Sequence, residues 1–208
     1  MRVTSKPKRS AQPAEPEGTR ARVLRVAWQM IDQRRAASIT LVDVAREAGV
    51  SRQTVYLLFG SRAGLLLAMV DDVDGRSEGP GRMAAARSTA APAQLLEAYA
   101  RAWLAYVPVV FPVARALASA AASGDADAAA AWDTRMQRLR GGLLQVMRTM
   151  QAEGLLRPEW TPATAADWAY SAMHVDVWQH LVVDCRWKPR DAADRIVGGL
   201  ARALMKGG

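Results

Sequence analysis

Two short helix patterns on either side of a single glycine constrain this chain more than any other feature. Thr40 can cap the start of a helix with its hydroxyl, and an acidic residue follows three positions later, the spacing of a capping box. After a short helix predicted over 41–48, Gly49 permits a left-handed turn, and Ser51 can cap a second helix over 52–59. The sequence therefore predicts a helix, a tight turn and a second helix.

The second helix of this unit offers polar side chains to its surroundings. Val55 and Phe59 are four residues apart and are expected to face inward. The outer and flanking positions then hold Arg52, Gln53, Thr54 and Tyr56. Arginine can grip guanine, glutamine adenine and threonine a thymine methyl, while tyrosine or threonine can bond phosphate. An exposed arginine is more often simply solvated, so this polar face by itself does not distinguish DNA binding from a solvated surface.

Charge and an upstream helix favour DNA as the partner. An amphipathic helix is predicted over 19–36, because its apolar residues recur at helical spacing. Residues 20–62 contain eight arginines and three acidic residues, a net charge of +5 out of +8 for the whole chain, whose pI is near 10.3. Clustered cations gain affinity for polyanions by displacing counterions. The upstream helix, the helix-turn-helix pattern and the positive charge together predict a basic three-helix DNA-binding unit.

The run from Ile39 to Leu67 closely resembles the DNA-binding region of the TetR family of bacterial regulators. It departs from the usual family pattern at 34–38, which lacks a common glycine, at Gly60, where proline is frequent, and at Arg62, which replaces a common lysine. Arg62 would lie at a helix start, where phosphate is favoured. The resemblance implies that Thr40, Tyr56 and Arg62 hold the DNA backbone, and that Arg52, Gln53 and Thr54 approach the bases.

The remainder of the chain predicts an all-α protein. The expected organisation is a flexible basic arm at 1–18, a helix-turn-helix DNA-binding domain at 19–62, a linking helix and loop at 63–91, and a helical ligand-binding and dimerisation domain at 92–208. Asp74 to Pro92 contains glycines and prolines typical of a connection. Proline and glycine positions further predict helices at 92–106, 108–123, 126–153, 162–184 and 189–206.

Aromatic residues concentrate in the C-terminal part, where six of the seven tryptophans lie beyond residue 100. In a generic helical bundle these side chains would be core, and a lone histidine on an apolar helix is more often a core residue than a ligand contact. The resemblance implies an apolar cavity for a small molecule among the middle helices. The side chains expected to line it are Trp103, Tyr106, Phe111, Met136, Met147, Tyr170, His174 and Trp178.

The last two predicted helices are rich in small and aliphatic residues, which permit close helix approach. These residues are Ala165, Ala169, Ala172, Ile196, Gly199, Leu200, Ala203 and Leu204. The resemblance implies that these helices pair in a homodimer, which would place two recognition helices about 34 to 36 Å apart on a palindromic operator.

Other function classes find little support. The single cysteine, Cys185, allows no intrachain disulfide, and the sequence shows neither metal-ligand spacing nor a phosphate loop, so we expect no enzyme, catalytic residue, metal or cofactor. No signal peptide or membrane span is expected, which predicts a soluble cytoplasmic protein with no membrane partner. The sequence thus predicts a sequence-specific repressor released from double-stranded DNA by a small hydrophobic or aromatic effector. The alternative is an architectural or ligand-independent DNA-binding protein.

Overall fold

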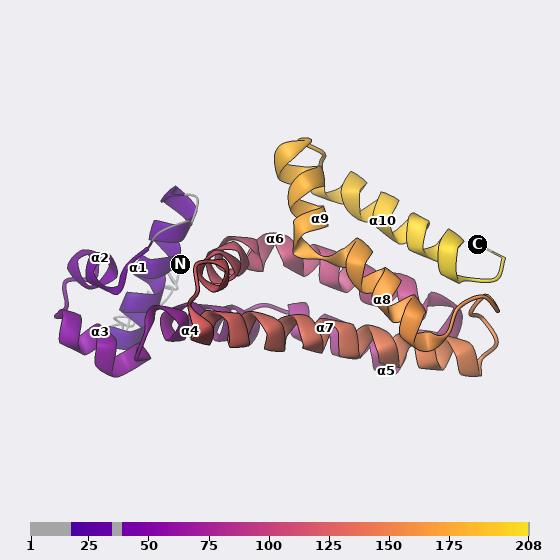
Figure 1. Cartoon of the computed structure of the whole chain (residues 1–208), viewed down its shortest axis with the longest axis horizontal. Coiled ribbons are helices and arrows are strands. Elements are labelled where there is room, and N and C mark those ends of the chain that lie inside the picture. The colour runs from indigo at the N-terminus through magenta and orange to yellow at the C-terminus, as the bar shows by residue number, and fades with distance from the viewer. Residues whose placement is uncertain (1–17, 35–38, 208) are drawn as a thin grey trace, which may run out of the picture.

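The computed structural model describes residues 18–34 and 39–207, which are helical throughout most of their length (Figure 1). At one end of the elongated molecule lie α1 (Thr19–Arg34), α2 (Leu41–Glu47), α3 (Arg52–Phe59) and the start of α4 (Arg62–Arg76). The described residues form no sheet, only an isolated bridge between Leu156 and Met205. The all-α prediction is confirmed. All but Gly18 of the predicted arm lies outside the described residues.

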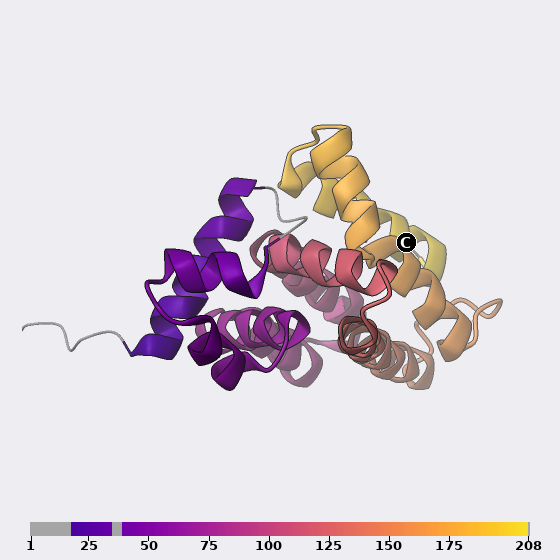
Figure 2. The same ribbon diagram turned by 60° about the vertical axis from the view of Figure 1, so that its left-hand side comes forward.

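The second part of the molecule is a larger helical bundle. Its elements are α5 (Gly79–Thr89), a 3-10 turn (Pro92–Gln94), α6 (Leu95–Ala122), α7 (Ala126–Ala152), α8 (Pro162–Met173), α9 (Val175–Trp178), a π-helical segment (Gln179–Asp184) and α10 (Pro189–Leu204). α8 packs on α7, and α10 packs on α6 and α8. Figures 1 and 2 both place α9 and α10 away from α2 and α3.

The capped helices around Gly49 form as the sequence predicts. The Thr40 hydroxyl accepts a hydrogen bond of 3.1 Å from the Asp43 amide, and the Ser51 hydroxyl accepts one of 3.0 Å from the Thr54 amide. Gly49 has a φ of 63°, in the left-handed region that glycine enters without a steric cost. The turn geometry therefore follows from these local side chains.

The turn between α3 and α4 explains one departure from the family pattern. Gly60 has a φ of 72°, which proline, fixed near −65°, cannot adopt. Ser61 follows and caps α4, since its hydroxyl accepts a hydrogen bond of 3.1 Å from the Gly64 amide. Val55 and Phe59 are buried, as predicted, and hold α3 against the core.

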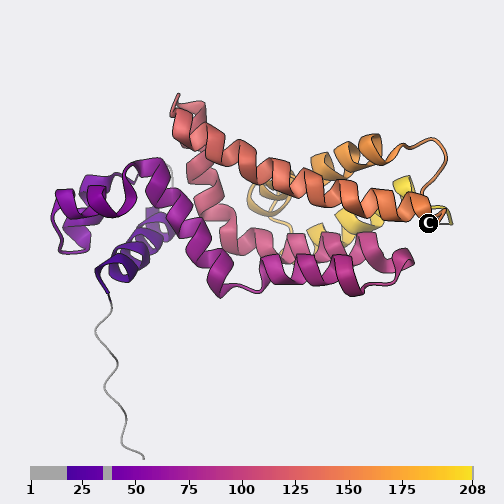
Figure 3. The same ribbon diagram turned by 90° about the horizontal axis from the view of Figure 1, so that it is seen from below.

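A helix break expected near Pro108 is absent. α6 continues from Leu95 to Ala122 with Pro108 and Pro112 inside it. Each proline removes one backbone donor and crowds the preceding turn, which usually costs about 3 kcal/mol. Val107, Val110 and their neighbours on α6 are buried on both sides of the prolines, so packing offsets this cost. Figure 3 shows α6 bending in its second half toward the start of α7.

The expected loop at 74–92 is also wrong, because most of it is helical. α4 continues to Arg76, and α5 covers Gly79–Thr89 with a proline in its first turn. Gly79 is a close-approach residue here: a Cβ placed on it would lie 2.2 Å from the Tyr106 ring. The glycine that indicated a loop instead lets α5 pack tightly on α6.

The helix predicted over 162–184 is interrupted. α8 ends at Met173, and His174 adopts an extended backbone with φ −62° and ψ 146°. Its ring Nδ1 accepts a hydrogen bond of 3.3 Å from the Asp176 amide, so the histidine side chain caps α9. A π-helical segment then completes the turn before α10. A side-chain cap that helical periodicity does not reveal is the physical reason for the break.

One helical stretch, 92–122, is long and apolar enough to cross a membrane, and half of its most apolar window is buried inside the protein. α3 and α4 pass the same test as a pair, bent by 64°. The expectation that no segment approaches a membrane span is therefore corrected. The core helix of a bundle passes this test too, and α6 packs against α4, α5, α7 and α10.

We expect Gly79→Ala to destabilise the protein by about 1 to 3 kcal/mol, because its methyl group would overlap the Tyr106 ring. Gly81→Ala is the matched control on the same helix, since a Cβ there meets nothing within 4 Å. It should be neutral or stabilising by up to about 1 kcal/mol. Urea unfolding followed by circular dichroism measures both. Equal stability of the two variants would contradict this packing of α5 on α6.

Candidate nucleic-acid interface and ligand pocket

The exposed face of α3 holds three of the polar side chains predicted to bind DNA. Arg52, Gln53 and Tyr56 are all exposed. Arg52 donates a hydrogen bond of 3.3 Å to the Tyr56 hydroxyl, and its guanidinium lies 5.2 Å from the centroid of the Tyr56 ring. The structure thus places a cation and a phenol together, with a side-chain amide on the same short helix.

Two predicted hydroxyl contacts already have partners within the protein. The Thr54 hydroxyl lies 2.8 Å from the Ser51 hydroxyl and takes part in the N-cap of α3. The Thr40 hydroxyl donates a 2.8 Å hydrogen bond to the Asp43 carboxylate while it caps α2. Thr40 would have to exchange its hydrogen bond to Asp43 in order to donate to DNA.

Arg62 has a structural contact that the sequence did not indicate. Its Nε donates a 2.9 Å hydrogen bond to the carbonyl of Ile39, the residue before the cap of α2. This contact ties the start of α4 to the start of the helix-turn-helix. Arg62 therefore helps to position α2 whatever its role toward phosphate.

Sequence reasoning gave no role to the apolar residues that α3 exposes. Leu57 is 82% exposed, and its neighbour Leu58 is 36% exposed. The sequence contained the signal, because Val55 and Phe59 define the inward face. Leu57 is two residues from each of them, which places it on the opposite, outward face of the helix. The exposed face of α3 is therefore partly apolar.

A pocket of about 500 Å³ opens among α4, α5, α6 and α7, which we call the main pocket. Its lining residues are Asp74, Pro80, Met83, Arg87, Tyr99, Trp103, Tyr106, Arg135, Met136, Arg138, Leu139, Gly141, Gly142 and Gln145. This volume falls within the range of small-molecule sites. The lining mixes aromatic and aliphatic walls with arginines.

One end of the main pocket contains a polar network. Tyr106 donates a hydrogen bond to Asp74, and Arg135 donates one of 3.1 Å to the same carboxylate and one of 3.2 Å to the Tyr106 hydroxyl. Burial, followed by the hydrogen bond to Asp74, raises the pKa of Tyr106 above its usual value. The phenol therefore stays protonated at neutral pH and remains a donor, while the Asp74 and Arg135 charges offset each other.

The other end of the main pocket joins Arg87, Tyr99 and Gly142. The Arg87 guanidinium lies 5.5 Å from the centroid of the Tyr99 ring. A Cβ placed on Gly142 would lie 2.1 Å from the Tyr99 hydroxyl and 3.4 Å from Nη1 of Arg87, so only glycine fits on α7 here. Burial raises the pKa of Tyr99, although Arg87 opposes the shift, so this phenol is also neutral at pH 7.

The side chains predicted to line a cavity fall into several places. Trp103, Tyr106 and Met136 line the main pocket. Met147 is completely buried, while Phe111 and Trp178 contact each other with ring centroids 4.7 Å apart. These three lie outside the main-pocket lining. Aromatic content alone does not distinguish a pocket wall from a packed core.

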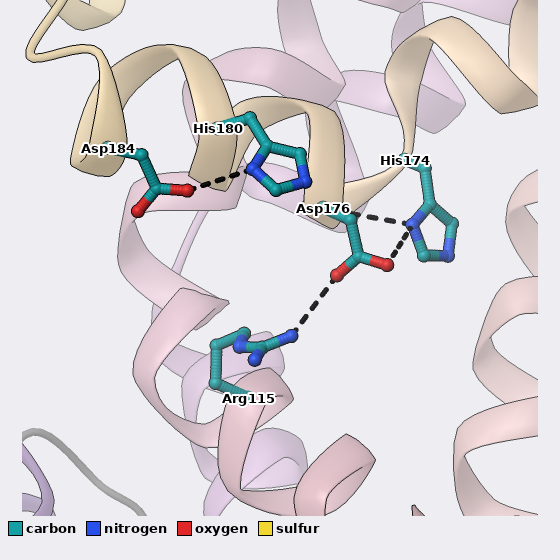
Figure 4. A network of polar contacts seen from close by, with 5 residues as sticks. All are labelled: Arg115, His174, Asp176, His180 and Asp184. Atoms are coloured by element: carbon teal, nitrogen blue, oxygen red, sulfur yellow. Dashed lines mark hydrogen bonds and ion pairs between the residues drawn. The ribbon is translucent and has the colours of Figure 1, made fainter.

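His174 and Tyr170 lie together outside the main pocket, with ring centroids 5.5 Å apart. Tyr170 lines a smaller hollow of about 170 Å³. Figure 4 shows the His174 ring beside Asp176, whose carboxylate also accepts a 3.1 Å hydrogen bond from Arg115. His180 and Asp184 form a separate pair at 2.8 Å (Figure 4). In this structure His174 acts as a helix cap.

The sequence did not predict several of the pocket residues, because identifying them requires knowing how the helices pack against one another. Arg87, Tyr99 and Gly142 come from three different helices, α5, α6 and α7. Helical periodicity places each on a face but does not pair the faces. Once α5, α6 and α7 are known to pack together, the glycine opposite a tyrosine identifies the close approach.

Five of the eight small and aliphatic residues expected at a dimer contact, including Ile196, are buried within the subunit. Ala165, Ala169 and Leu204 have no exposed surface, and Leu200 is 1% exposed. Trp168 on α8, by contrast, is 51% exposed, and its ring centroid lies 6.2 Å from that of Trp160. The outer surface of α8 thus exposes one large aromatic side chain, Trp168, among small and polar residues.

Comparison with known proteins identifies the N-terminal region. Residues 23–69 match the family model described as bacterial regulatory proteins, tetR family. The HTH-type transcriptional regulator EthR of Mycolicibacterium smegmatis is 32% identical over 75 residues, which cover 36% of this chain and 34% of that protein. The HTH-type transcriptional regulator AlkX of Mycobacterium tuberculosis is 69% identical over 29 residues, 14% of each chain. The alignments thus span about a third or less of these relatives.

Solved structures extend the similarity to the whole fold. A SmeT–triclosan complex superposes with a TM-score of 0.73 at 15% identity, over 91% of this chain and 93% of that one. A transcriptional regulator from Saccharomonospora viridis in complex with choline gives 0.72 at 18% identity, over 90% and 97%. At these identities the superpositions establish the fold. The sequence match to the tetR family of bacterial regulatory proteins thus covers residues 23–69, and the chain as a whole shares the fold of these solved regulators.

Proposed function

We propose that this protein is a ligand-responsive transcriptional repressor, and not an enzyme, which binds operator DNA through α3 and releases it when a small molecule fills the main pocket. The observation that carries this proposal is the position of α4. Its first residue, Arg62, bonds to the backbone before α2, and Asp74 near its other end lines the main pocket. One helix therefore contacts both candidate sites.

The DNA-binding role rests on the chemistry and charge of the N-terminal helices. Arg52 and Gln53 have the side chains that pair with guanine and adenine edges, and both are exposed on α3. The net charge of +5 over 20–62 favours a polyanion. We assign backbone contacts to Thr40, Tyr56 and Arg62, and base contacts to Arg52, Gln53 and Thr54.

The ligand-responsive role rests on the main pocket and its link to α4. SmeT has been solved with triclosan and the S. viridis regulator with choline, so this fold accommodates small molecules. A ligand that favours one position of α4 would shift α2 and α3 through the Arg62 contact. Among the predicted lining residues, Trp103, Tyr106 and Met136 are placed to contact it.

We further propose a cytoplasmic homodimer that binds a palindromic operator. Two recognition helices related by a two-fold axis would meet successive major grooves. The surface of α8 around the exposed Trp168 is the candidate contact between subunits. The domain boundaries proposed are 19–62 for DNA binding and 92–208 for ligand binding and dimerisation, with 63–91 linking them and contributing Asp74, Pro80, Met83 and Arg87 to the main pocket.

The experiment that tests this function compares an operator selected from random duplexes with a scrambled duplex of the same length. A repressor should bind the selected duplex at least about a thousandfold more tightly at physiological salt. Equal affinities would instead support a ligand-independent architectural protein.

We expect Gln53→Ala to weaken discrimination at one base pair of the selected operator by about 1 to 3 kcal/mol, because it removes a bidentate contact to a base edge. Binding to scrambled DNA should be unchanged. Gln151→Ala, an exposed glutamine at the end of α7, is the matched control. Fluorescence anisotropy with single-base operator variants measures the effect. Unaltered discrimination would remove Gln53 from base recognition.

We expect Arg62→Ala to weaken binding to selected and scrambled duplexes alike and to reduce the slope of log K against log salt by about 1 in magnitude. The variant should also be less stable, because it loses the hydrogen bond to the Ile39 carbonyl. Salt titration distinguishes the two effects, since a purely structural role leaves the slope unchanged. That result would refute the phosphate contact.

We expect Trp168→Glu to convert the dimer to a monomer, because it places a charge in the proposed aromatic contact. Val109→Glu, at another exposed apolar position on α6, is the control. Sedimentation velocity measures the oligomeric state of both. A dimeric Trp168→Glu protein would rule out the surface of α8 around Trp168 as the contact.

A further inference from the structure

The main pocket is organised in three layers along α5, α6 and α7, which Figure 3 shows beside one another. In the first layer, Gly79 and Arg135 both contact Tyr106. In the third layer, Arg87 and Gly142 both contact Tyr99. On α6, Tyr99 and Tyr106 are seven residues apart, and on α7, Arg135 and Gly142 are also seven residues apart. Two helical turns, about 10 Å, therefore separate the layers.

The middle layer is apolar. The same register places Met83, Trp103 and Leu139 between the two polar layers, and Met136 lines the pocket beside them. The Trp103 indole already donates a 2.8 Å hydrogen bond to the Met173 carbonyl, so its ring is left to face the pocket as an apolar wall. The pocket is therefore an apolar channel with a polar layer at each end.

The two polar layers differ in charge. In the first layer Arg135 pairs with Asp74, so the charges there are balanced. In the described part of the chain, Arg87 and Arg138 have no ion pair with a carboxylate, and both line the pocket. With three arginines and one aspartate, the lining has a net charge of +2. The excess positive charge lies away from Asp74.

We propose that the main pocket binds an organic carboxylate, with its apolar body along the middle layer and its carboxylate against Arg87. This inference rests on the proposed function, since it specifies the effector that the main pocket would take. The planar guanidinium presents parallel N–H groups that match a carboxylate, and the neutral Tyr99 hydroxyl beside it can donate another hydrogen bond. Gly141 and Gly142 add no side chains that would obstruct this end.

Neutral and cationic ligands fit this arrangement less well. Arg87 is an exposed residue, so a neutral molecule in the pocket would leave its guanidinium hydrated and would gain no charge-assisted hydrogen bond from it. The aromatic walls from Tyr99, Trp103 and Tyr106 could attract a quaternary ammonium. Arg87 and Arg138 would repel that charge, so the anion is favoured over both alternatives.

The test uses the full-length protein and two matched sets of probes. The first set is decanoate, decanamide and decyltrimethylammonium, and the second is 2-naphthylacetate and its amide. Titration calorimetry at pH 7 should show each carboxylate binding about tenfold or more tightly than its amide, the gain expected for hydrogen bonds to a charged group. Decyltrimethylammonium should bind more weakly than decanoate.

Variants of Arg87 identify the contact. Arg87→Gln should abolish the preference for carboxylate over amide, whereas Arg87→Lys should keep part of it because the charge remains. Arg82→Gln is the matched control on α5, since Arg82 pairs with Glu78 and lies outside the pocket lining. Thermal unfolding of each variant confirms that the fold is retained.

The outcomes separate this inference from the proposed function. Equal binding of acids and amides, tighter binding of the ammonium, no binding of any probe, or a preference that survives Arg87→Gln would each overturn the carboxylate site. Release of the selected operator is measured separately by anisotropy. Arg87-dependent carboxylate binding without operator release would support the site while contradicting the ligand-responsive function.

Discussion

The arrangement of the larger bundle depends on the contact among Asp74, Tyr106 and Arg135. These residues come from α4, α6 and α7, and their hydrogen bonds join the three helices at one end of the main pocket. The network satisfies both charges, which would be unfavourable singly in this partly buried position. Gly79 completes it, because only a residue without a side chain lets α5 approach the Tyr106 ring. A polar network and a close glycine contact therefore fix the same layer.

The same network extends the influence of the pocket to the N-terminal helices. Asp74 lies twelve residues after Arg62 on α4, about 18 Å along a rigid helix. Arg62 bonds to the carbonyl of Ile39, directly before the cap of α2. A displacement of α4 at Asp74 thus acts on the helix-turn-helix through one covalently continuous element. No separate chain of side-chain contacts is needed to connect the two sites.

The sequence predicted those features that depend on neighbouring residues. The caps at Thr40 and Ser51 and the left-handed Gly49 are local, so the helix-turn-helix was recognisable without tertiary information. The continuation of α6 through Pro108 was not predictable, because packing against distant helices offsets the local cost of the proline. The prediction of the pocket-lining residues was partly wrong for the same reason. Met147 and Trp103 are both large apolar residues on helices, and only the packing register of three helices decides which is core and which lines the pocket.

The two polar layers of the main pocket have different roles in our proposal: the Arg87 layer provides affinity for the ligand, and the Asp74 layer provides the response of α4. Arg87 and Tyr99 lie on α5 and α6, so a carboxylate bound there contacts no residue of α4 at that end. A ligand with equal affinity for both positions of α4 cannot shift their equilibrium, however tightly it binds. The differential contact must come from the far end of the ligand, about two helical turns away, where Asp74 belongs to α4. The length of the apolar body then decides the response, because a short carboxylate would occupy the Arg87 layer without reaching the helix that connects to DNA.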